Sequence, residues 1–328
     1  MATDNILFVL LGPTAVGKTE VSLRLAEHLG CPIVSADSRQ MFRDIPIGTA
    51  APTPEEQGRV KHYFVGQLTL EDYYSASRYE SEALDVIQPH FAAGGDAMLL
   101  SGGSMMYIDA VCDGIDEMPD VRDDIRNALK EEYAANGLEP LVAELQQRDP
   151  QYAAQCDLQN HVRVIHALEI CRQTGNTYTS LRTRNNRRCT RVCETDHPSI
   201  RPFRIVKIGL DRPREELFDR INRRVTAMVE QGFIDEARRV LPWRQYNSLN
   251  TVGYKEIFKY FDGEWPLDMT LDRMRKNTRV YAKKQLTWFR RDPSIHWFHP
   301  DKIDDIIAFV DDIMADREKY STLCYDSY

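Results

Sequence analysis

The chain has no long apolar run: its longest stretches are about six residues in a sequence of 328. Because a helix that crosses a bilayer needs about 20 apolar residues, we expect no membrane segment. The N-terminus, Met-Ala-Thr-Asp-Asn, lacks the basic start of a secretory signal. Internal repeats and low-complexity tracts are also absent. These absences favour an ordinary cytoplasmic globular protein, which we expect to be a monomer.

Cysteine is scarce and follows no pattern. The seven cysteines are odd in number and scattered, which indicates reduced thiols rather than a disulfide framework. Cys189, Cys193 and His197 fit no standard zinc spacing, and a fourth ligand is not evident. We therefore expect no zinc site there.

Acidic residues outnumber basic ones, which gives a net charge of −8, but the basic residues are unevenly distributed along the chain. The segment from Asp301 to Tyr328 holds much of the acidic excess. Five arginines lie between 182 and 191, and eight lysines or arginines lie between 273 and 291. Charges are screened beyond about 10 Å, so a locally basic surface can still bind a polyanion. We predict RNA contacts for both basic stretches; the alternatives are a solvated linker for the first and an amphipathic core helix for the second.

The first hundred residues alternate between strand and helix patterns. Strands are predicted at 6–11, 33–36 and 97–101, and helices after Lys18 and at 76–91. Such alternation predicts a parallel sheet with helices on both faces. Helical periodicity alone then fills 121–133, 138–147 and 162–172, before strand patterns return at 204–210 and 295–298 and helices at 214–231, 234–241 and 271–289. We predict an α/β core made of 1–115 and 200–328, with an inserted helical domain at 116–199.

One motif dominates what the sequence does contain. It reads Gly12-Pro13-Thr14-Ala15-Val16-Gly17-Lys18-Thr19 and lies between the first strand pattern and a helical pattern. In this context the backbone N–H groups and the helix N-terminus converge on one anion, which predicts a polyphosphate site at all eight residues. Lys18 would reach the outer phosphate, and the Thr19 hydroxyl would bind Mg²⁺. The motif does not distinguish ATP, GTP and a prenyl diphosphate, and a simple tight turn is the alternative.

The acid that such a loop usually works with is missing from its usual place. The strand predicted at 97–101 leads into Gly-Gly-Ser without a carboxylate, which weakens an ATPase interpretation. A carboxylate follows another strand, at Asp37. Because strand ends of an α/β sheet share one crevice, Asp37 should face the phosphate loop and could remove a proton from an attacking acceptor. The alternatives are that Asp37 caps a helix or that it binds the groups that coordinate magnesium, without touching the ion itself.

With further blocks, these residues resemble a known family, the tRNA dimethylallyltransferases, which prenylate the adenine just 3′ of certain anticodons. The resemblance covers nearly the whole chain. Beyond the loop it rests on Asp37-Ser38-Arg39-Gln40-Met41-Phe42, Ile47-Gly48-Thr49-Ala50, Gly102-Gly103-Ser104 with Tyr107, Arg163 with Ala167-Leu168-Glu169, Val252-Gly253-Tyr254-Lys255 and Thr278-Arg279-Val280-Tyr281-Ala282-Lys283-Lys284-Gln285. In this order the blocks are far more specific than the loop alone.

The resemblance implies a P-loop NTPase-like core and transfer of a dimethylallyl group from dimethylallyl diphosphate to adenosine N6, in tRNAs that read codons beginning with U. Asp37 would accept the N6 proton, and Arg279 would neutralise the departing diphosphate. Thr19 would assist through Mg²⁺, the implied cofactor. The inserted domain would clasp the anticodon stem-loop.

The resemblance also implies a set of tRNA contacts. Ser104 stands where the family more often has threonine. Where many members carry His-Pro-Asn-Asp this chain reads Asp157-Leu158-Gln159-Asn160-His161, and His166 replaces a second arginine. The implied tRNA-binding residues are Asp37, Ser38, Arg39, Gln40, Ser104, Arg122, Arg163, Asn250, Thr251, Val252, Gly253, Tyr254 and Lys255.

Two other functions remain open at this point: an ATP-dependent small-molecule or nucleoside kinase, and a non-catalytic RNA-binding factor that uses nucleotide as a switch. The chemistry of the residues favours transfer. An adenine amine is a poor nucleophile that must leave the base stack, and an allylic diphosphate ionises readily once its leaving charge is matched. We therefore predict a prenyltransferase.

Overall fold

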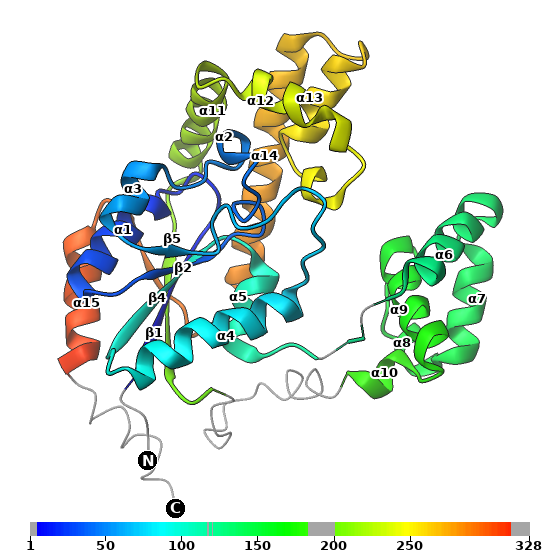
Figure 1. Cartoon of the computed structure of the whole chain (residues 1–328), viewed down its shortest axis with the longest axis horizontal. Coiled ribbons are helices and arrows are strands. Elements are labelled where there is room, and N and C mark those ends of the chain that lie inside the picture. Colours follow the sequence, from blue (N-terminus) through cyan, green and yellow to red (C-terminus); the bar gives the residue numbers. More distant parts are fainter. Residues whose placement is uncertain (1–4, 117, 120, 183–200, 316–328) are drawn as a thin grey trace, which may run out of the picture. The chain divides into compact units, whose positions relative to one another are not determined.

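The protein is described by a computed structural model, which covers residues 5–116, 118–119, 121–182 and 201–315 (Figure 1). Contacts within the chain divide it into two compact units. One unit contains the chain up to Asp113 and from Asp196 onward, and the other runs from Gly114 to Thr195.

The described part of the first unit contains one sheet of six parallel strands, in the order β3-β2-β4-β1-β5-β6. Strand β1 is central and pairs with β4 on one side and β5 on the other. The predicted α/β fold with a parallel sheet is confirmed, although the short strand β3 was not predicted. The strands are β1 (Ile6–Leu11), β2 (Ile33–Ala36), β3 (His62–Tyr63), β4 (Ala97–Gly102), β5 (Arg204–Leu210) and β6 (His296–Phe298).

The helices of this unit include α4, α11, α12 and α14, which confirm the four helices predicted between 76 and 289. Helix α5 follows β4 directly and was not predicted, and neither was α13. None of the helices in the described residues combines the length and apolar character that a bilayer crossing requires. The bounds are α1 (Lys18–Leu29), α2 (Pro46–Thr49), α3 (Pro54–Arg59), α4 (Ala76–Ala92), α5 (Met105–Asp113), α11 (Arg214–Glu230), α12 (Phe233–Val240), α13 (Tyr254–Phe261), α14 (Leu267–Phe289) and α15 (Ile303–Ala315), with 3₁₀ turns η2 (Leu241–Trp243) and η3 (Asn247–Leu249).

Strand β1 shows why its sequence is apolar at every position. Leu7 and Val9 belong to a core that includes residues of α4 and α5, whereas Phe8 and Leu10 belong to a second core with α1 and α15. Successive side chains of a strand point to opposite faces, so a strand covered on both faces must be apolar throughout. The sheet is therefore the middle layer between two helical layers, and its central strand carries the phosphate loop at its carboxyl end.

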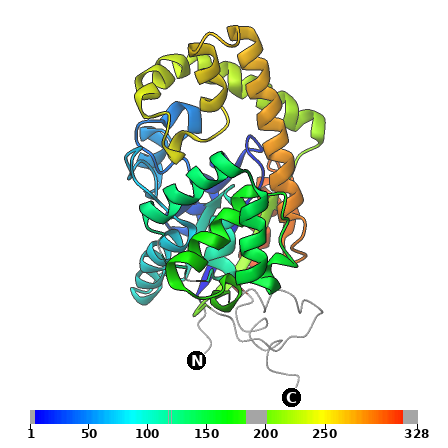
Figure 2. The ribbon, with the colours of Figure 1, turned by 90° about the vertical axis from the view of Figure 1, so that its right-hand side faces the viewer.

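Helices α11, α12, α13 and α14 gather at that carboxyl end of the sheet, together with α2 (Figures 1 and 2). Helix α14 packs on α11, α13 and α5, and α12 packs on α2. Side chains from this helical group can therefore reach the phosphate loop.

All the regular elements in the described residues of the second unit are helices. The helices predicted at 121–133, 138–147 and 162–172 are confirmed as α6, α7 and α9. Leu129, Leu141 and Leu168 lie in its core at 0 % exposure. Its elements are α6 (Asp123–Asn136), α7 (Glu139–Arg148), α8 (Pro150–Ala153), α9 (His161–Thr174) and α10 (Tyr178–Leu181).

Candidate functional site

The phosphate loop follows β1 and has a positive φ at three positions, Gly12 with 156°, Ala15 with 65° and Gly17 with 114°. Gly17 precedes the first residue of α1, where a side chain would strain the backbone. Lys18 Nζ donates to the carbonyl oxygens of Gly12 at 3.0 Å and Pro13 at 2.8 Å. An ammonium carries three donors, so one is left for a ligand of the loop. Thr19 is exposed in the first turn of α1.

The charges of Asp37 and Arg224 both act on the ammonium of Lys18. Burial lowers the pKa of Lys18 to about 8, while the charge of Asp37 raises it and that of Arg224 lowers it further. These effects require the carboxylate of Asp37 and the guanidinium of Arg224 to lie near the ammonium. The expected meeting of Lys18 and Asp37 at one end of the sheet is therefore found in the structure.

Asp37 lies in the turn after β2, and one of its oxygens is committed to that turn. Oδ1 accepts hydrogen bonds from the backbone N–H groups of Arg39 at 2.9 Å and Gln40 at 3.3 Å. These bonds cap a turn, whereas the alternative weighed was a helix cap, and no helix of the described residues begins at this turn. Among the described residues Oδ2 makes no hydrogen bond, so the same carboxylate has one fixed oxygen and one available to accept a proton.

Ser104, at the carboxyl end of β4, holds the Asp37 turn in place. Its Oγ accepts from Ser38 N at 2.8 Å and lies 3.1 Å from Ser38 Oγ, and its own N–H donates to Ala36 O at 3.0 Å. Only a hydroxyl is needed for these bonds, which explains why serine suffices where the family more often has threonine. Ser104 is 9 % exposed, so its role here is to position the turn.

Gln285 on α14 joins the phosphate loop to the end of β4. Its Oε1 accepts from Thr14 N at 2.9 Å, and its Nε2 donates to Gly103 O at 2.8 Å. A Cβ at Gly103 would lie 2.6 Å from Gln285 Nε2 and 3.6 Å from Lys18 Nζ, so a larger residue there would displace Gln285. Sequence reasoning gave Gln285 no role, because this contact spans 271 residues.

The structure does not bring Arg279 to the phosphate loop. Its Nη1 donates to Asn222 Oδ1 at 2.9 Å, and its guanidinium lies 5.6 Å from the ring centroid of Phe218. Six residues separate Arg279 from Gln285, which turns its side chain by roughly 240° around the axis of α14. The contact of Arg279 with the diphosphate therefore stays a prediction, and in this structure the Arg279 side chain binds Asn222 instead.

Arg224 on α11 carries the guanidinium whose charge acts on both Lys18 and Asp37. Its Nη2 donates to Thr49 O at 3.3 Å. Burial lowers the pKa of Arg224, and the nearby Asp37 raises it. One turn earlier, Arg220 Nε donates to Ala15 O at 2.9 Å in the phosphate loop. The sequence signal that could have found the pair is two arginines four residues apart on the helix that follows β5.

Aromatic rings and Arg39 border Asp37. Burial raises the pKa of Tyr281 to about 12, and the charge of Asp37 acts in the same direction. Burial also raises the pKa of Tyr107, whose ring stacks on Tyr79 with centroids 4.2 Å apart. Arg39 Nη1 donates to Asn247 O at 2.7 Å, which ties the Asp37 turn to η3. Tyr281 is 37 % exposed, so part of its side chain is accessible near the Asp37 carboxylate.

Tyr254 is an interior residue. It is 0 % exposed, and its hydroxyl donates to Glu236, which also accepts from Ile47 N and Gly48 N at 2.8 Å each. Tyr254 and Gly253 are both buried in this structure, and their implied tRNA contacts stay predictions. Through Glu236, Tyr254 fixes α2, whose last residue supplies the carbonyl that Arg224 binds.

Other implied tRNA contacts are accessible. Asn250 and Lys255 are exposed in the first unit, and Arg122 and Arg163 are exposed in the second, where Arg122 pairs with Asp124. Accessibility allows an RNA contact without demonstrating one. These residues, with Ser38, Gln40, Thr251 and Val252, remain predictions.

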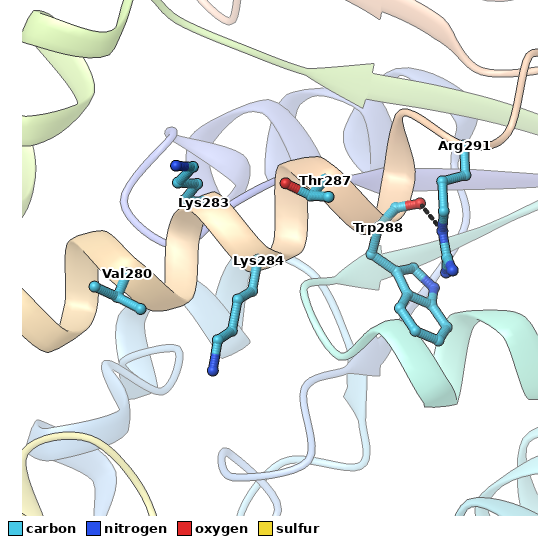
Figure 3. Close-up of a pocket in the computed structure, with 6 residues that line it drawn as sticks. All are labelled: Val280, Lys283, Lys284, Thr287, Trp288 and Arg291. Carbon is cyan, nitrogen blue, oxygen red and sulfur yellow. Dashed lines mark hydrogen bonds between the residues drawn. The ribbon is translucent and has the colours of Figure 1, made fainter. Parts of the chain in front are cut away.

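The basic stretch on α14 has a buried side and a side that lines a surface cavity, so its RNA contact stays a prediction. Phe289 is 3 % exposed and packs in the core, whereas another face borders a surface cavity of about 360 Å³ (Figure 3). Of the arginines at 182–191, only Arg182 lies within the described residues. Cys189, Cys193 and His197 lie outside them. The cavity is lined by Val280, Lys283, Lys284, Thr287, Trp288 and Arg291.

A parallel sheet whose central strand ends in a phosphate loop, with an ammonium, a guanidinium and a carboxylate around it, defines a P-loop α/β protein with a polyphosphate site. Within that class, the chain belongs to the IPP transferase family, whose model matches residues 40–292.

Relatives and solved structures agree with this membership. A tRNA dimethylallyltransferase 2 of Parabacteroides distasonis is 53 % identical over 93 % of this chain and 97 % of its own length. A tRNA dimethylallyltransferase 1 of Phocaeicola vulgatus is 54 % identical over 93 % and 98 %. The crystal structure of the full-length tRNA isopentenylpyrophosphate transferase of Bacillus halodurans has a TM-score of 0.69 and 34 % identity, covering 97 % of this chain and 99 % of that one.

Proposed function

We propose that the protein transfers the dimethylallyl group of dimethylallyl diphosphate to N6 of the adenosine that follows the anticodon in tRNA. The observation that carries the proposal is the meeting of Asp37 with Lys18 and Arg224 at the phosphate loop. The names of its relatives supply the reaction class. The kinase alternative is not favoured. Action in the cytoplasm, where tRNA is found, and a monomeric state are part of the proposal.

The diphosphate binds in the phosphate loop, where backbone N–H groups, the third donor of Lys18 and the guanidinium of Arg224 surround it. The Thr19 hydroxyl fits Mg²⁺, because this ion usually keeps several waters and takes few protein ligands beside the substrate phosphates. When bound, Mg²⁺ would neutralise part of the diphosphate charge. Cations held at the leaving group are worth most as charge develops there in the transition state.

The adenine enters from the other side of Asp37, beside the ring of Tyr281. Its N6 lone pair forms the bond to the allylic carbon, the carbon–oxygen bond to diphosphate breaks, and the electron pair leaves with the diphosphate oxygen. The N6 proton passes to Asp37 Oδ2. The base must leave the anticodon-loop stack to reach this position, which a general base alone cannot achieve, so the basic and aromatic surfaces have to hold the RNA.

Incubation with radiolabelled dimethylallyl diphosphate and unmodified tRNA tests the reaction. We expect label in RNA, located at N6 of the adenosine after the anticodon by mass spectrometry of the nucleosides. Phosphorylation of a nucleoside from ATP, with no label in RNA, would support the kinase instead. RNA binding that is unchanged by Asp37→Ala, with no transfer by either protein, would support the non-catalytic RNA-binding factor.

The pH dependence of diphosphate binding tests the role of Lys18. Burial lowers its pKa to about 8 in the free protein, so the ammonium is lost as pH rises above that value. An anion favours the charged form, and affinity should therefore fall by up to about tenfold per pH unit above 8 and stay level below it. Calorimetric titration of the protein with inorganic diphosphate and Mg²⁺ measures this. A range from about pH 6.5 to about pH 9.5 covers pH values below and above the pKa of Lys18. Lys18→Met should bind weakly at every pH and lose the transition, which is the control; a wild-type affinity that is level across the range contradicts the prediction.

A further inference from the structure

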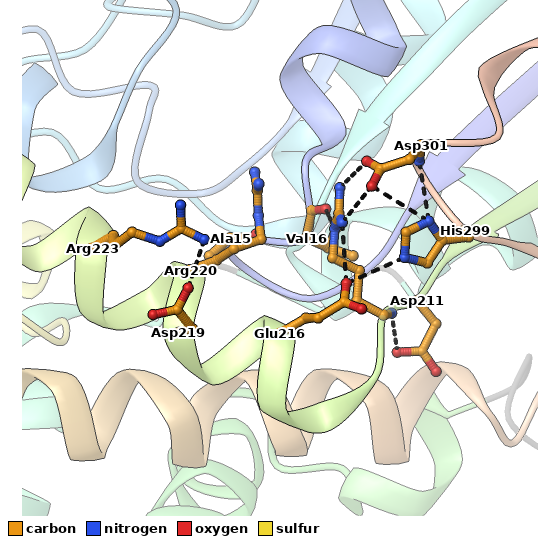
Figure 4. A network of polar contacts seen from close by, with 10 residues as sticks. Ala15, Val16, Asp211, Glu216, Asp219, Arg220, Arg223, His299 and Asp301 are labelled. Atoms are coloured by element: carbon orange, nitrogen blue, oxygen red, sulfur yellow. Dashed lines mark hydrogen bonds and ion pairs between the residues drawn. The ribbon is translucent and has the colours of Figure 1, made fainter.

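Two arginines that have no role in the proposed reaction bind backbone carbonyl oxygens of the phosphate loop. Arg212 Nε donates to Val16 O at 2.8 Å, and Arg220 Nε donates to Ala15 O at 2.9 Å (Figure 4). The two carbonyl oxygens belong to neighbouring residues of the loop. Arg212 comes from the segment between β5 and α11, so a distant part of the chain reaches the back of the loop.

Arg212 is itself fixed by carboxylates. Its side chain is 8 % exposed, its Nη1 lies 3.0 Å from Asp301 Oδ2 and 3.4 Å from Glu216 Oε2, and its Nη2 also pairs with Asp301. His299 Nε2 lies 3.5 Å from Glu216 Oε2, on the far side of the network. A planar guanidinium in such a fork can turn very little, so its Nε–H keeps one direction.

The direction of the Val16 carbonyl matters because it belongs to the same planar peptide group as the N–H of Gly17. In a trans peptide the two bonds point in opposite directions, so the donor that fixes the direction of the Val16 carbonyl also fixes that of the Gly17 N–H. Among the described residues, Gly17 N–H donates no hydrogen bond, whereas Val16 N–H donates to Pro13 O at 3.3 Å. Gly17 N–H is therefore a donor that the loop keeps for its ligand.

We propose that Arg212 is a positioning residue that aims the Gly17 amide at the diphosphate, and that Asp301, ahead of α15, orients Arg212 for this task. The proposal rests on the diphosphate site of the proposed function. It assigns Arg212 an action through the backbone rather than through its charge, since the guanidinium is occupied by two carboxylates and a carbonyl oxygen.

Replacement of Arg212 separates this role from general stability. In Arg212→Ala the Kd for inorganic diphosphate with Mg²⁺ and the KM for the prenyl donor should each rise about tenfold, which corresponds to about 1.4 kcal/mol. The KM for tRNA should stay within about twofold of the wild-type value, since no RNA contact is altered. Arg212→Lys should recover only part of the loss, because one ammonium cannot bind the Val16 carbonyl oxygen and both carboxylate oxygens of Asp301 at the same time.

Replacement of Asp301 gives a test in which two explanations differ in sign. Asp301→Ala removes a negative charge close to the loop, so an action through charge alone predicts tighter diphosphate binding. The positioning role predicts weaker binding, by about three- to fivefold, because Arg212 loses its main partner. Asp301 is 65 % exposed, so the variant should fold.

Asp219→Ala is the matched control. Asp219 is 62 % exposed, lies on α11 and pairs with Arg223 (Figure 4). Among the described residues, Arg223 makes no hydrogen bond to the phosphate loop. Loss of Asp219 removes the same charge without touching Arg212, and diphosphate binding should change by less than about twofold.

Tighter or unchanged binding in Asp301→Ala, with Arg212→Ala also unchanged, would overturn the proposal. So would a loss in Arg212→Ala that appears only as a lower melting temperature and a smaller active fraction, with both KM values kept. Because diphosphate binding is measured by calorimetry without RNA, these outcomes are independent of the transfer assay. A wild-type protein that binds diphosphate but transfers no prenyl group would contradict the proposed function and leave the Arg212 measurements decisive for the loop.

Discussion

Asp37→Asn is expected to lower kcat about a thousandfold, within the range of roughly 10²–10⁴ that a positioned general base contributes. An asparagine side-chain oxygen can still accept from the N–H groups of Arg39 and Gln40, as Oδ1 of Asp37 does. The turn should therefore persist while the proton acceptor is lost. The diphosphate should bind at least as tightly, since a negative charge beside Lys18 is removed. Single-turnover transfer of labelled prenyl group to tRNA measures the chemical step.

Asp72→Asn is the control for a change of the same kind outside the site. Asp72 Oδ2 likewise accepts from a backbone N–H, that of Thr69 at 2.7 Å, in an exposed turn. Its kcat should be that of the wild type within about twofold. If Asp37→Asn kept about a tenth or more of the wild-type rate, its carboxylate would be a cap and not the base.

The sequence predicted those parts of the site that depend on neighbouring residues. The phosphate loop is a continuous motif between a strand and a helix, and Asp37 directly follows the apolar residues of β2. Since parallel strands end at the same edge of a sheet, their proximity could be inferred without coordinates. The strands and long helices were predictable for the same reason, because their periodicity is local.

The residues that were missed act across long sequence separations. Gln285 is 271 residues from Thr14, and Arg224 is 175 residues from Thr49. Helical periodicity shows which side chains share a face, but it does not show which neighbour that face meets. The same limit explains why two side-chain contacts were not foreseen: Arg279 donates to Asn222 on α11, and Tyr254 donates to Glu236.

The Arg212 contact follows this rule as well. It joins residues 196 positions apart and involves a backbone carbonyl, for which a sequence motif carries no side-chain signal. The phosphate loop therefore receives its sequence-predicted residues from one short segment and its supporting bonds from α11, α14 and the segment before α15. Loop geometry in this protein is a property of the fold, so substitutions far from the motif should alter donor binding.

Arg224→Gln should lower kcat for transfer about 10²–10³-fold, as expected when a preorganised charge is removed from a leaving group. Arg279→Gln should lower it by less than about threefold, because the Arg279 guanidinium is held by Asn222 on α11 and not at the loop. Steady-state kinetics with the prenyl donor varied at saturating tRNA compares the two. Both substitutions remove one positive charge, so each controls for the change in net charge in the other.

The order of the two effects decides which helix supplies the cation for the leaving group. Arg224→Lys should restore part of the rate, since a charge remains but the planar fork that matches phosphate oxygens is lost. A larger loss in Arg279→Gln than in Arg224→Gln would mean that Arg279 leaves Asn222 and reaches the diphosphate when the donor binds. In that case α14, which already holds the loop through Gln285, would also neutralise the leaving group; with the expected order, α14 positions the loop and α11 supplies the charge.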